Sequence, residues 1–427
     1  MHAAVEDIEY RAIRKVSRRL IWFLVILYAF SYLDRINIGF ASLSMNKDLR
    51  LTATQFGLAN TIFYLGYILC EIPSNLMLAH YGARLWLPRI LITWGIASAA
   101  TMFATSARSL YSIRAVVGLA EGGFLPGVLL YLTLWFPQAH RARTNALFMI
   151  AQPLTIALGA PLSGLILDRH GAFGMAAWRW LFLVEGLPSA LLGIAAYFYL
   201  TDRPQDAKWL AADEKEALVR SIGPAPDRGQ RTPWREMLSR NVVLLSIAYF
   251  GLVMTLNTIV TWTPQIVREM RVEHSFSSVG LLTALPALIA AACMPLWSAH
   301  SDRRKERAWH IVAPMAFAAL GWIFVASFAL PDLRMLGLVL CSTGGFAAMS
   351  VLWAVPPLLL SPAARPAGIA FISSCGILAS MATPLLIGFL RDLTHSFVAG
   401  VYLLAVVLIG GSALVIAAVR KGSGAGW

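Results

Sequence analysis

The sequence predicts an all-α integral membrane protein, with twelve transmembrane helices arranged as two six-helix halves. Of the 427 residues, 58% are hydrophobic and 13% are charged, whereas about 25% are charged in a typical soluble domain. The mean hydropathy is +0.67. Apolar runs long enough to cross a hydrocarbon core of roughly 30 Å recur along the whole chain. One long polar segment, residues 202–240, divides these runs into two groups of six.

The twelve runs are separated by short polar connections. They cover residues 20–42, 56–79, 86–105, 109–136, 142–167, 180–201, 241–266, 279–299, 309–330, 334–360, 366–390 and 396–419. Within the polar segment, Trp209–Leu218 carries apolar residues at helical spacing, which predicts a short amphipathic helix on the membrane surface. We expect an N-terminus over 1–19, an N-terminal bundle over 20–201, a linker over 202–240, a C-terminal bundle over 241–419 and a tail over 420–427.

The positive charges predict the orientation. Of the 35 Lys and Arg residues, 24 fall on the side of the N-terminus and nine on the opposite side. Because cytoplasmic loops carry the excess of Lys and Arg, both termini and the linker are expected in the cytoplasm. The net charge of +13 is scattered over these loops, so a nucleic-acid partner is not expected. No small-residue cleavage site follows the first apolar run, which therefore reads as an uncleaved span.

An acid and a base lie side by side inside the first run. Asp34 and Arg35 are flanked by uncharged residues on both sides. A charge at the centre of a spanning helix costs at least about 2.5 kcal/mol, so such residues usually face a partner or a water-filled space. Adjacent helical residues point about 100° apart and pair poorly with each other. We expect the two side chains to have separate tasks in a polar space between helices, with a buried structural ion pair as the alternative.

The fourth run adds a second acid and base. Arg114 and Glu121 are seven residues apart, so they share one helical face at an axial separation of roughly 10 Å. The formal charges of these two residues and of Asp34 and Arg35 sum to zero if both acids are ionised. Each proton or bound anion changes that net charge by one. The alternative is a salt network that only locks the bundle. The nearby glycines predict close helix packing; they are Gly118, Gly122, Gly123 and Gly127.

Other polar or aromatic side chains within the runs are candidates for a substrate site. As a group they would supply the rim and the stacking surface that a carboxylate needs, although each one alone is more often a packing or hydrogen-bonding residue. They are Tyr64, Tyr67, Gln152, Asn257, Gln265, Trp353, Ser373 and Ser374.

An internal repeat relates the two halves. The segments are Gly164-x-x-x-Asp168 after Pro161 and Gly388-x-x-x-Asp392 after Pro384, offset by 224 residues. An offset near half the chain, with an even number of spans, predicts a parallel duplication with the substrate site where the halves meet.

Motifs of soluble enzymes are absent from the sequence. There is no GxxxxGK phosphate loop, HExxH, GxSxG or strand-linked GxGxxG. The four cysteines form no CxxC or His-linked spacing, so no metal site or disulfide framework is implied. We expect no enzymatic activity and no cofactor, and uphill transport would draw on an ion gradient.

These residues together resemble the anion:cation symporter branch of the major facilitator superfamily, which includes bacterial tartrate, galactonate, phthalate and hydroxyphenylacetate permeases. The resemblance covers nearly the whole chain. It rests on Tyr32–Ala41, Gly66-Tyr67, Glu71–Asn75, Arg114 with Glu121-Gly122, Trp135–Pro137, Asp202–Pro204 and Trp209-Leu210.

The resemblance implies a role for each matched position. Arg35 would engage the substrate carboxylate, Asp34 and Glu121 would carry coupled protons, and Arg114 would link the two acids. The implied cavity-lining residues are Tyr67, Gln152 and Trp353. In the loop after the eighth run, Asp302 and Arg303 keep the acid and base of the superfamily's loop motif, which implies a part in conformational gating.

One departure bears on the substrate. Ser373 and Ile377 stand where asparagines are frequent in close relatives, which weakens any transfer of sugar-acid specificity and favours an aromatic or less hydroxylated acid.

The sequence thus predicts a monomeric, proton-coupled symporter of the bacterial inner membrane. It would import a small organic acid anion, either aromatic or tartrate-like, by alternating access in the lipid bilayer. A proton-driven exporter or antiporter on the same fold is the first alternative. A membrane sensor that binds the same ligand without transporting it is the second.

Overall fold

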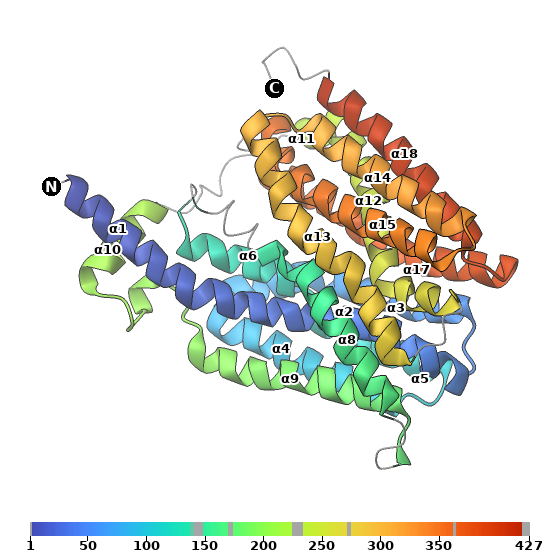
Figure 1. Ribbon diagram of the computed structural model, residues 1–427. Coiled ribbons are helices and arrows are strands. Elements are labelled where there is room, and N and C mark those ends of the chain that lie inside the picture. Colours follow the sequence, from blue (N-terminus) through green and yellow to red (C-terminus); the bar gives the residue numbers. More distant parts are fainter. Residues whose placement is uncertain are drawn as a thin grey trace.

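The computed structural model describes residues 2–137, 140, 148–169, 174–223, 234–270, 275–361 and 364–420. These residues are almost entirely helical, and no strand occurs among them (Figure 1). The helices of the first half are α1 (His2–Val16), α2 (Trp22–Asp48), α3 (Ala53–Tyr81), α4 (Ala83–Ala99), α5 (Ala107–Glu121), α6 (Phe124–Trp135), α8 (Ala151–Asp168) and α9 (Ala177–Tyr199). Those after it are α10 (Ala212–Ile222), α11 (Trp234–Met237), α12 (Arg240–Glu269), α13 (Phe276–Arg304), α14 (Ala308–Ser327), α15 (Pro331–Leu352), α16 (Pro356–Leu359), α17 (Arg365–Thr394) and α18 (Val398–Arg420).

Within the described residues, eleven helical segments are long and apolar enough to cross a membrane. They correspond to every expected run except the fifth, 142–167. The start of that run lies outside the described residues, and its remainder is α8. Because α8 packs in the bundle against α2, α9 and α13, it occupies the place of the fifth span.

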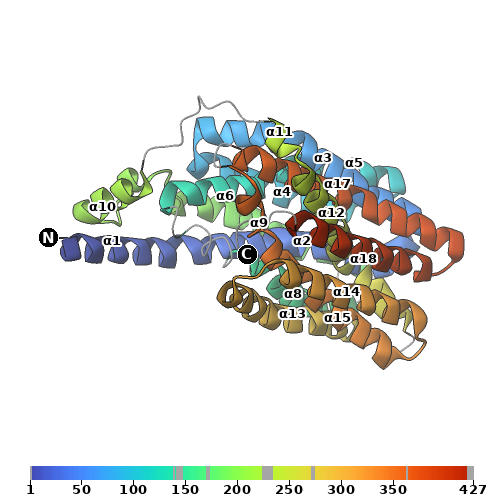
Figure 2. The ribbon, with the colours of Figure 1, turned by 90° about the horizontal axis from the view of Figure 1, so that it is seen from above.

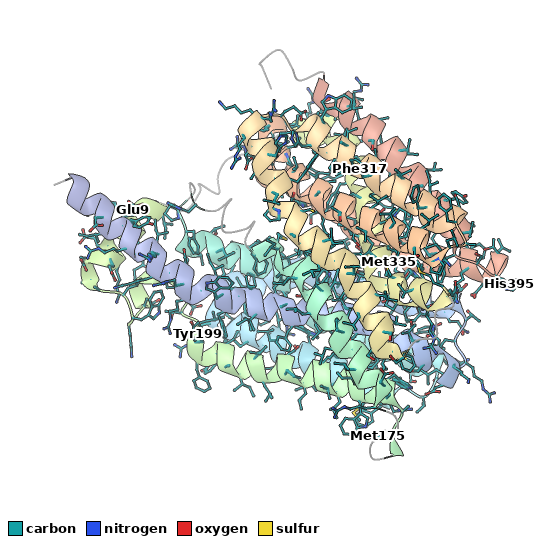
Figure 3. All side chains as sticks on the ribbon, viewed as in Figure 1. Glu9, Met175, Tyr199, Phe317, Met335 and His395 are labelled. Carbon is teal, nitrogen blue, oxygen red and sulfur yellow. The ribbon has the colours of Figure 1, made fainter. Side chains whose placement is uncertain are left out.

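The helices form two halves that meet at one end. Inside the first half α4 packs on α9 and α3 on α5, while inside the second α14 packs on α15 and α18, and α12 on α17. Between the halves, α8 packs on α13 and α3 on α17. Figure 1 shows the two halves diverging toward the end that holds both termini. Figure 3 places Glu9 near that end and His395 at the opposite one.

Two aspartates hold the halves together at the end opposite the termini. Asp168, at the end of α8, accepts hydrogen bonds from the N–H groups of Phe276 and Ser277 at 2.7 and 2.8 Å. Asp392 of α17 accepts bonds from the N–H groups of Ala53 and Thr54 at 3.0 and 2.7 Å. Each carboxylate therefore caps the free N–H groups of a helix in the other half.

We call these two contacts the aspartate clasps. They are the two members of the internal repeat seen in the sequence. A Cβ on Gly164 would overlap the carbonyl oxygen of Phe276, and one on Gly388 would overlap that of Ala53. The repeated glycines thus allow the close approach, and the repeated aspartates bond across it.

Three helix boundaries differ from the expected runs. α1 continues through a π-helical turn, Ser17–Ile21, directly into α2, so no break separates the N-terminus from the first span. The fourth run is broken between α5 and α6, because Gly123 adopts the left-handed conformation with φ of 90°, which glycine tolerates without a steric penalty. The tenth run is likewise broken between α15 and α16, next to Trp353.

The helix expected in the linker is α10, which packs against α1 (Figure 2). Leu218 is fully buried in this contact, so part of the apolar side of α10 is covered by protein. The Lys15 ammonium lies 2.5 Å from a carboxylate oxygen of Glu214, whose other oxygen accepts the Ala211 N–H at 3.1 Å. Burial alone would raise the pKa of Glu214, but Lys15 and the Ala211 N–H outweigh burial and hold that pKa below its ordinary value of 4.5.

Candidate functional site

The centre of the candidate site is an ion pair between Arg35 of α2 and Glu121 at the end of α5. Arg35 donates from Nε and from its terminal nitrogen to one carboxylate oxygen of Glu121, at 3.1 and 2.7 Å. Ser31 donates to the same oxygen at 3.1 Å. The other oxygen, Oε2, is buried without a hydrogen-bond partner. Glu121 therefore has one oxygen bound by three donors and one that remains available to a proton.

Aromatic rings of α3 surround the Arg35 guanidinium. Its central carbon lies 5.3, 5.8 and 6.0 Å from the ring centres of Tyr67, Phe63 and Tyr64. The Arg35 side chain is 21% exposed, whereas Glu121 is 1% exposed. The arginine is thus the member of the pair that retains access to a ligand, in a setting that favours a planar cation.

Arg114 does not pair with either acid, contrary to a simple salt network. Its guanidinium carbon lies 4.4 Å from the ring centre of Phe63, and its Nε is buried without a hydrogen-bond partner. No ion pair of Arg114 occurs among the described residues, although it interacts electrostatically with both Asp34 and Glu121. It is a buried cation that pairs with no carboxylate of the described residues.

Asp34 points away from its neighbour Arg35, into the interior of the first half. Its Oδ1 accepts hydrogen bonds from Ser98 Oγ and from Asn37 Nδ2, the latter at 3.1 Å. Its Oδ2 accepts one from Trp94 Nε1 at 3.3 Å. The two charges of the first run thus have separate partners, and only Arg35 contributes to the exposed site.

A second group of candidates lies two helical turns away along α2. Gln152 of α8 donates to the hydroxyl of Tyr28 at 2.5 Å. Trp353 makes an edge-to-face contact with Tyr249 of α12, with ring centres 5.2 Å apart, and the Tyr249 hydroxyl interacts electrostatically with that of Tyr28. Since Tyr28 precedes Arg35 by seven residues, it lies on the same face at a distance of about 10 Å along the axis.

The two candidates on α12 bond to the first half at different depths. Asn257 donates to the hydroxyl of Tyr64 at 2.9 Å, which connects it to the Arg35 surroundings. Gln265 donates to Ser42 at 2.8 Å and accepts from Arg391 at 3.1 Å. Because Ser42 lies seven residues beyond Arg35, toward the aspartate clasps, Gln265 belongs to the closed contact between the halves rather than to the Arg35 surroundings.

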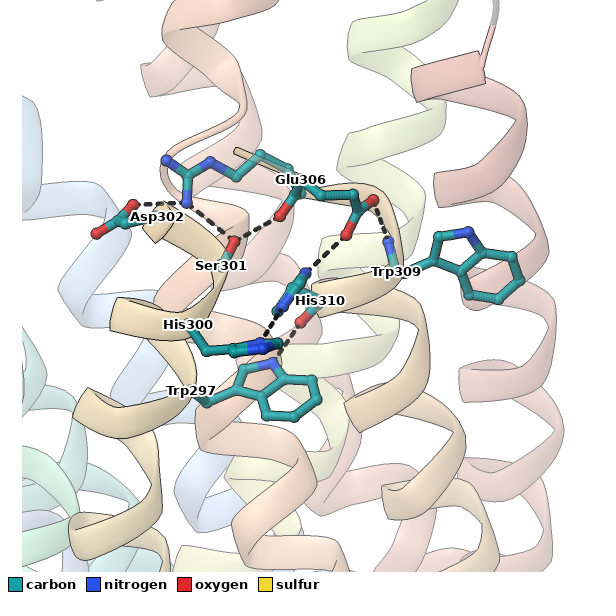
Figure 4. Close-up of polar contacts among 8 residues, drawn as sticks. Trp297, His300, Ser301, Asp302, Glu306, Trp309 and His310 are labelled. Atoms are coloured by element: carbon teal, nitrogen blue, oxygen red, sulfur yellow. Dashed lines mark hydrogen bonds and ion pairs between the residues drawn. The ribbon is translucent and has the colours of Figure 1, made fainter. Parts of the chain in front are cut away.

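The remaining candidates lie outside this cluster. Ser374 is exposed and donates to the Ala370 carbonyl of its own helix at 2.9 Å, and Ser373 is partly exposed with no hydrogen bond among the described residues. At the terminal end of the second half, Asp302 pairs with Arg307 at 2.6 Å (Figure 4), while Arg303 is exposed and makes no polar contact with the described residues.

A histidine pair lies beside this loop. His300 Nδ1 and His310 Nε2 are 2.8 Å apart, and His310 Nδ1 lies 2.6 Å from a carboxylate oxygen of Glu306 (Figure 4). All three residues belong to the second half, so the pair fixes the connection between α13 and α14.

Several polar residues near the site were not among the predicted candidates. Ser31 and Tyr28 precede Arg35 by four and seven residues, and this helical spacing was a usable signal. The two acids expected within the apolar runs, Asp34 and Glu121, are joined by a further one, Glu185 in α9, which is 1% exposed. An acid within the apolar run 180–201 was itself the signal. Glu71 of α3 is a half-buried acid that interacts electrostatically with Arg35.

The family assignment follows from comparison with known proteins. The profile of the Major Facilitator Superfamily matches residues 24–359, which reach from α2 to α16 and so include parts of both halves. The chain belongs to the Major Facilitator Superfamily.

Its relatives in the Major Facilitator Superfamily are transporters. A "Putative tartrate transporter" of Agrobacterium vitis is 41% identical over 406 residues, which cover 94% of this chain and 93% of the relative. A "Quinolone resistance transporter" of Acinetobacter baumannii is 32% identical over 409 residues, covering 95% and 94%. The chain is therefore a membrane transporter and not an enzyme, as the sequence predicted.

A solved structure of the superfamily shares the fold. A bacterial homolog of the human lysosomal transporter Spinster, in an inward-facing and occupied conformation, matches with a TM-score of 0.75. The alignment covers 94% of this chain and 96% of that one at 17% identity. At that identity the likeness concerns the fold alone.

Proposed function

We propose that the protein is a proton-coupled symporter that imports a small organic acid anion across the bacterial inner membrane. It works as a monomer, with both termini and the linker in the cytoplasm. The substrate class is a carboxylate, either tartrate-like or aromatic. The similarity to a tartrate transporter over nearly the full length supports the carboxylate class.

The observation that carries the proposal is the Arg35–Glu121 pair. Arg35 is partly exposed and ringed by aromatic side chains, while its counterion Glu121 is buried with one oxygen unpaired. Protonation of Glu121 at that oxygen would neutralise it and weaken its hold on Arg35. A substrate carboxylate can then take its place with the same two-pronged geometry.

Neutralisation links binding to movement. When the proton has bound to Glu121 but the anion has not arrived, Arg35 lacks a counterion, and an unpaired charge is costly to enclose in a dry contact. Once Glu121 is protonated and Arg35 is paired with the anion, the halves can close around the site and open on the other side. With the termini in the cytoplasm, the aspartate clasps lie on the periplasmic side, where they hold the two halves in contact.

The test uses purified protein in liposomes. A thermal-shift screen against mono- and dicarboxylates, L-tartrate among them, first identifies a ligand, since a molecule that binds only the folded state raises its stability. Uptake of that ligand is then measured under an imposed inward proton gradient. The expected result is accumulation by the wild type and none by Asp34→Asn or Glu121→Gln. If both variants still concentrate the ligand, the coupling scheme is wrong.

A second candidate is a proton-driven exporter on the same fold. The relative named as a quinolone resistance transporter is what favours it. Loading liposomes with the ligand, and separately with a quinolone, distinguishes the two directions. Efflux that requires inward proton movement supports the exporter and contradicts import.

A further inference from the structure

Glu185 of α9 is a buried acid that the mechanism above does not use. It is 1% exposed, and its Oε1 accepts a hydrogen bond from Ser163 Oγ of α8 at 2.8 Å. Its Oε2 is buried and has no hydrogen-bond partner. An ionised carboxylate with an unsatisfied oxygen and no cation is costly to bury, so a carboxyl group in this setting binds a proton instead.

Among the described residues, one other acid and no cation interacts electrostatically with Glu185. Asp34 of α2 interacts with it electrostatically, and the Asn37 side chain of α2 interacts with both acids. The residues of α4 that contact Asp34 are neutral: Trp94 and Ser98 both donate to it. No Lys, Arg or His forms an ion pair with either acid in the described part of the chain.

The cations near this pair, Arg179 and Arg114, form no ion pair with Glu185 in the described part of the chain. Arg179, the one arginine on α9, donates to the carbonyl oxygens of Met102 and Ala104 at the end of the helix near the clasps. Arg114 of α5 interacts electrostatically with Asp34, but it forms no ion pair with it. Glu185 thus lacks a counterion of its own.

The hydrogen bonds assign the proton to one of the two acids. Asp34 accepts from three donors, Ser98, Trp94 and Asn37, which suits an ionised carboxylate. Glu185 accepts one hydrogen bond, from Ser163, interacts with the Asn37 side chain and has an orphaned oxygen, and Asn37 Oδ1 is a second buried acceptor without a partner. A hydrogen on Glu185 Oε2 would provide a donor where only acceptors remain.

Resting on the function proposed above, we propose that Glu185 is a proton-binding residue that forms with Asp34 a buried two-acid site inside the first half. In the conformation closed by the aspartate clasps, this site holds one proton, on Glu185. Because Asp34 and Arg35 are consecutive on α2, a change in the charge of the two-acid site acts on the same helical turn that presents Arg35 to the substrate. The cycle then includes a proton that never contacts the anion.

The first experiment is independent of transport. Infrared spectra of the purified full-length protein at neutral pH are recorded for the carbonyl stretch of protonated carboxyl groups. The expected result is one such band that disappears in Glu185→Gln, shifts in Glu185→Asp and persists in the control Glu214→Gln. A band unchanged by Glu185→Gln, or removed by Asp34→Asn instead, would overturn the assignment.

The second experiment asks whether the proton takes part in the cycle. Radiolabelled L-tartrate is the probe in liposomes. Glu185→Gln is expected to retain tartrate exchange at equal concentrations while losing at least tenfold in proton-driven accumulation, and Glu185→Asp is expected to recover part of it. A merely structural role would impair exchange and accumulation alike, and that result contradicts the proposal.

The two experiments separate the failure of this proposal from failure of the proposed function. If tartrate is not transported at all, the symport proposal fails for this substrate, and the infrared band still decides whether Glu185 holds a proton. If transport is proton-driven but Glu185→Gln keeps full accumulation, the symport proposal stands and this one does not.

Discussion

Arg35 combines three properties at one residue: a fixed charge, a planar fork and partial exposure. The fork gives two bonds to one oxygen of Glu121, and the surrounding rings of α3 accept the flat face of the cation. A lysine ammonium at this position would keep the positive charge but would lack the planar fork. The site therefore depends on arginine and not merely on a positive charge.

Arg35→Lys tests this dependence. We expect affinity for the carboxylate found in the thermal-shift screen to fall by about tenfold or more, because losing a charge-assisted bond costs roughly 1.5–3 kcal/mol. Ligand titrations of the thermal midpoint measure the change. Arg303→Lys is the matched control, because Arg303 is an exposed residue near the end of α13 that makes no polar contact with the described residues, and it should bind as the wild type does. Equal affinity in both variants would contradict a two-pronged contact.

The site shows which side chains a sequence can assign. The presence of Arg35, Glu121, Tyr64 and Tyr67 in one cluster agrees with the expectation from charges in apolar runs. The ion-pair partners of these residues could not be predicted. Pairing depends on how each helix is rotated relative to its neighbours, and spacing along one helix does not determine that rotation. Arg114 and Glu121 share a face of the same run, yet Glu121 pairs across to α2.

At the scale of the element, close packing of α3 on α5 fixes the geometry of the ion pair. A Cβ on Gly118 would overlap the carbonyl oxygen of Phe63, and one on Gly66 would lie 2.7 Å from that of Ala115. The sequence predicted this packing from the spacing of small residues. It did not predict that α5 ends at Glu121. A glycine such as Gly123 can allow either close helix packing or a left-handed turn that ends a helix, and the sequence does not distinguish the two.

Gly118→Ala should therefore destabilise the protein. We expect a loss of about 1–3 kcal/mol in the free energy of unfolding, the usual cost of overfilling a packed contact. Thermal denaturation followed by circular dichroism measures it. Gly410→Ala in α18, where a Cβ would meet nothing within 4 Å, is the control and should lose no stability. Equal thermal midpoints for the two variants would mean that α3 can move away from α5 without a loss of stability.

The contact of α10 with α1 should depend on pH. Because the folded-state pKa of Glu214 is depressed, its pairing with Lys15 stabilises this contact above the ordinary pKa of 4.5, and the contribution is lost as pH falls through the lower folded value. Hydrogen exchange of α10 is expected to be up to about fivefold faster in Glu214→Gln near neutral pH. The difference should vanish in acid. A difference that persists at low pH would point to packing instead.

At the scale of the whole molecule, the halves are joined by contacts that recur through the internal repeat. The fold, the number of spans and the duplication could all be predicted, since they follow from hydropathy and a fixed offset. The helix boundaries were less accurate: the first span was expected to begin at residue 20, but the helix already begins at His2, because a polar helix can continue an apolar one when its own surface is solvated. The groups that Asp168 and Asp392 bind could not be predicted, because each aspartate bonds to backbone N–H groups of the other half.

Removing both clasps should open the end opposite the termini. We expect Asp168→Ala with Asp392→Ala to shift the equilibrium by about thirtyfold, since each lost helix cap costs roughly 1 kcal/mol. The measurement is the rate of maleimide labelling of Ser42→Cys, a residue that is 4% exposed at the closed contact, in a background without native cysteines.

The control for this prediction is Glu269→Ala. Glu269 lies at the same end but pairs with Arg391 inside the second half. Its loss should leave the labelling rate unchanged. Faster labelling in the control, or no acceleration in the double variant, would show that the clasps do not hold the halves closed.

Because α1 continues into α2 without a break, the N-terminal helix should move together with the helix that carries Arg35. The 15 residues of α1 form a lever about 22 Å long, rigidly continuous with the helix that presents Arg35 and braced by α10. When the first half tilts, the tip of this lever sweeps a wider arc than any residue within the bilayer. A fluorophore placed there would report the swing from the aqueous side, without touching the path that the cargo takes.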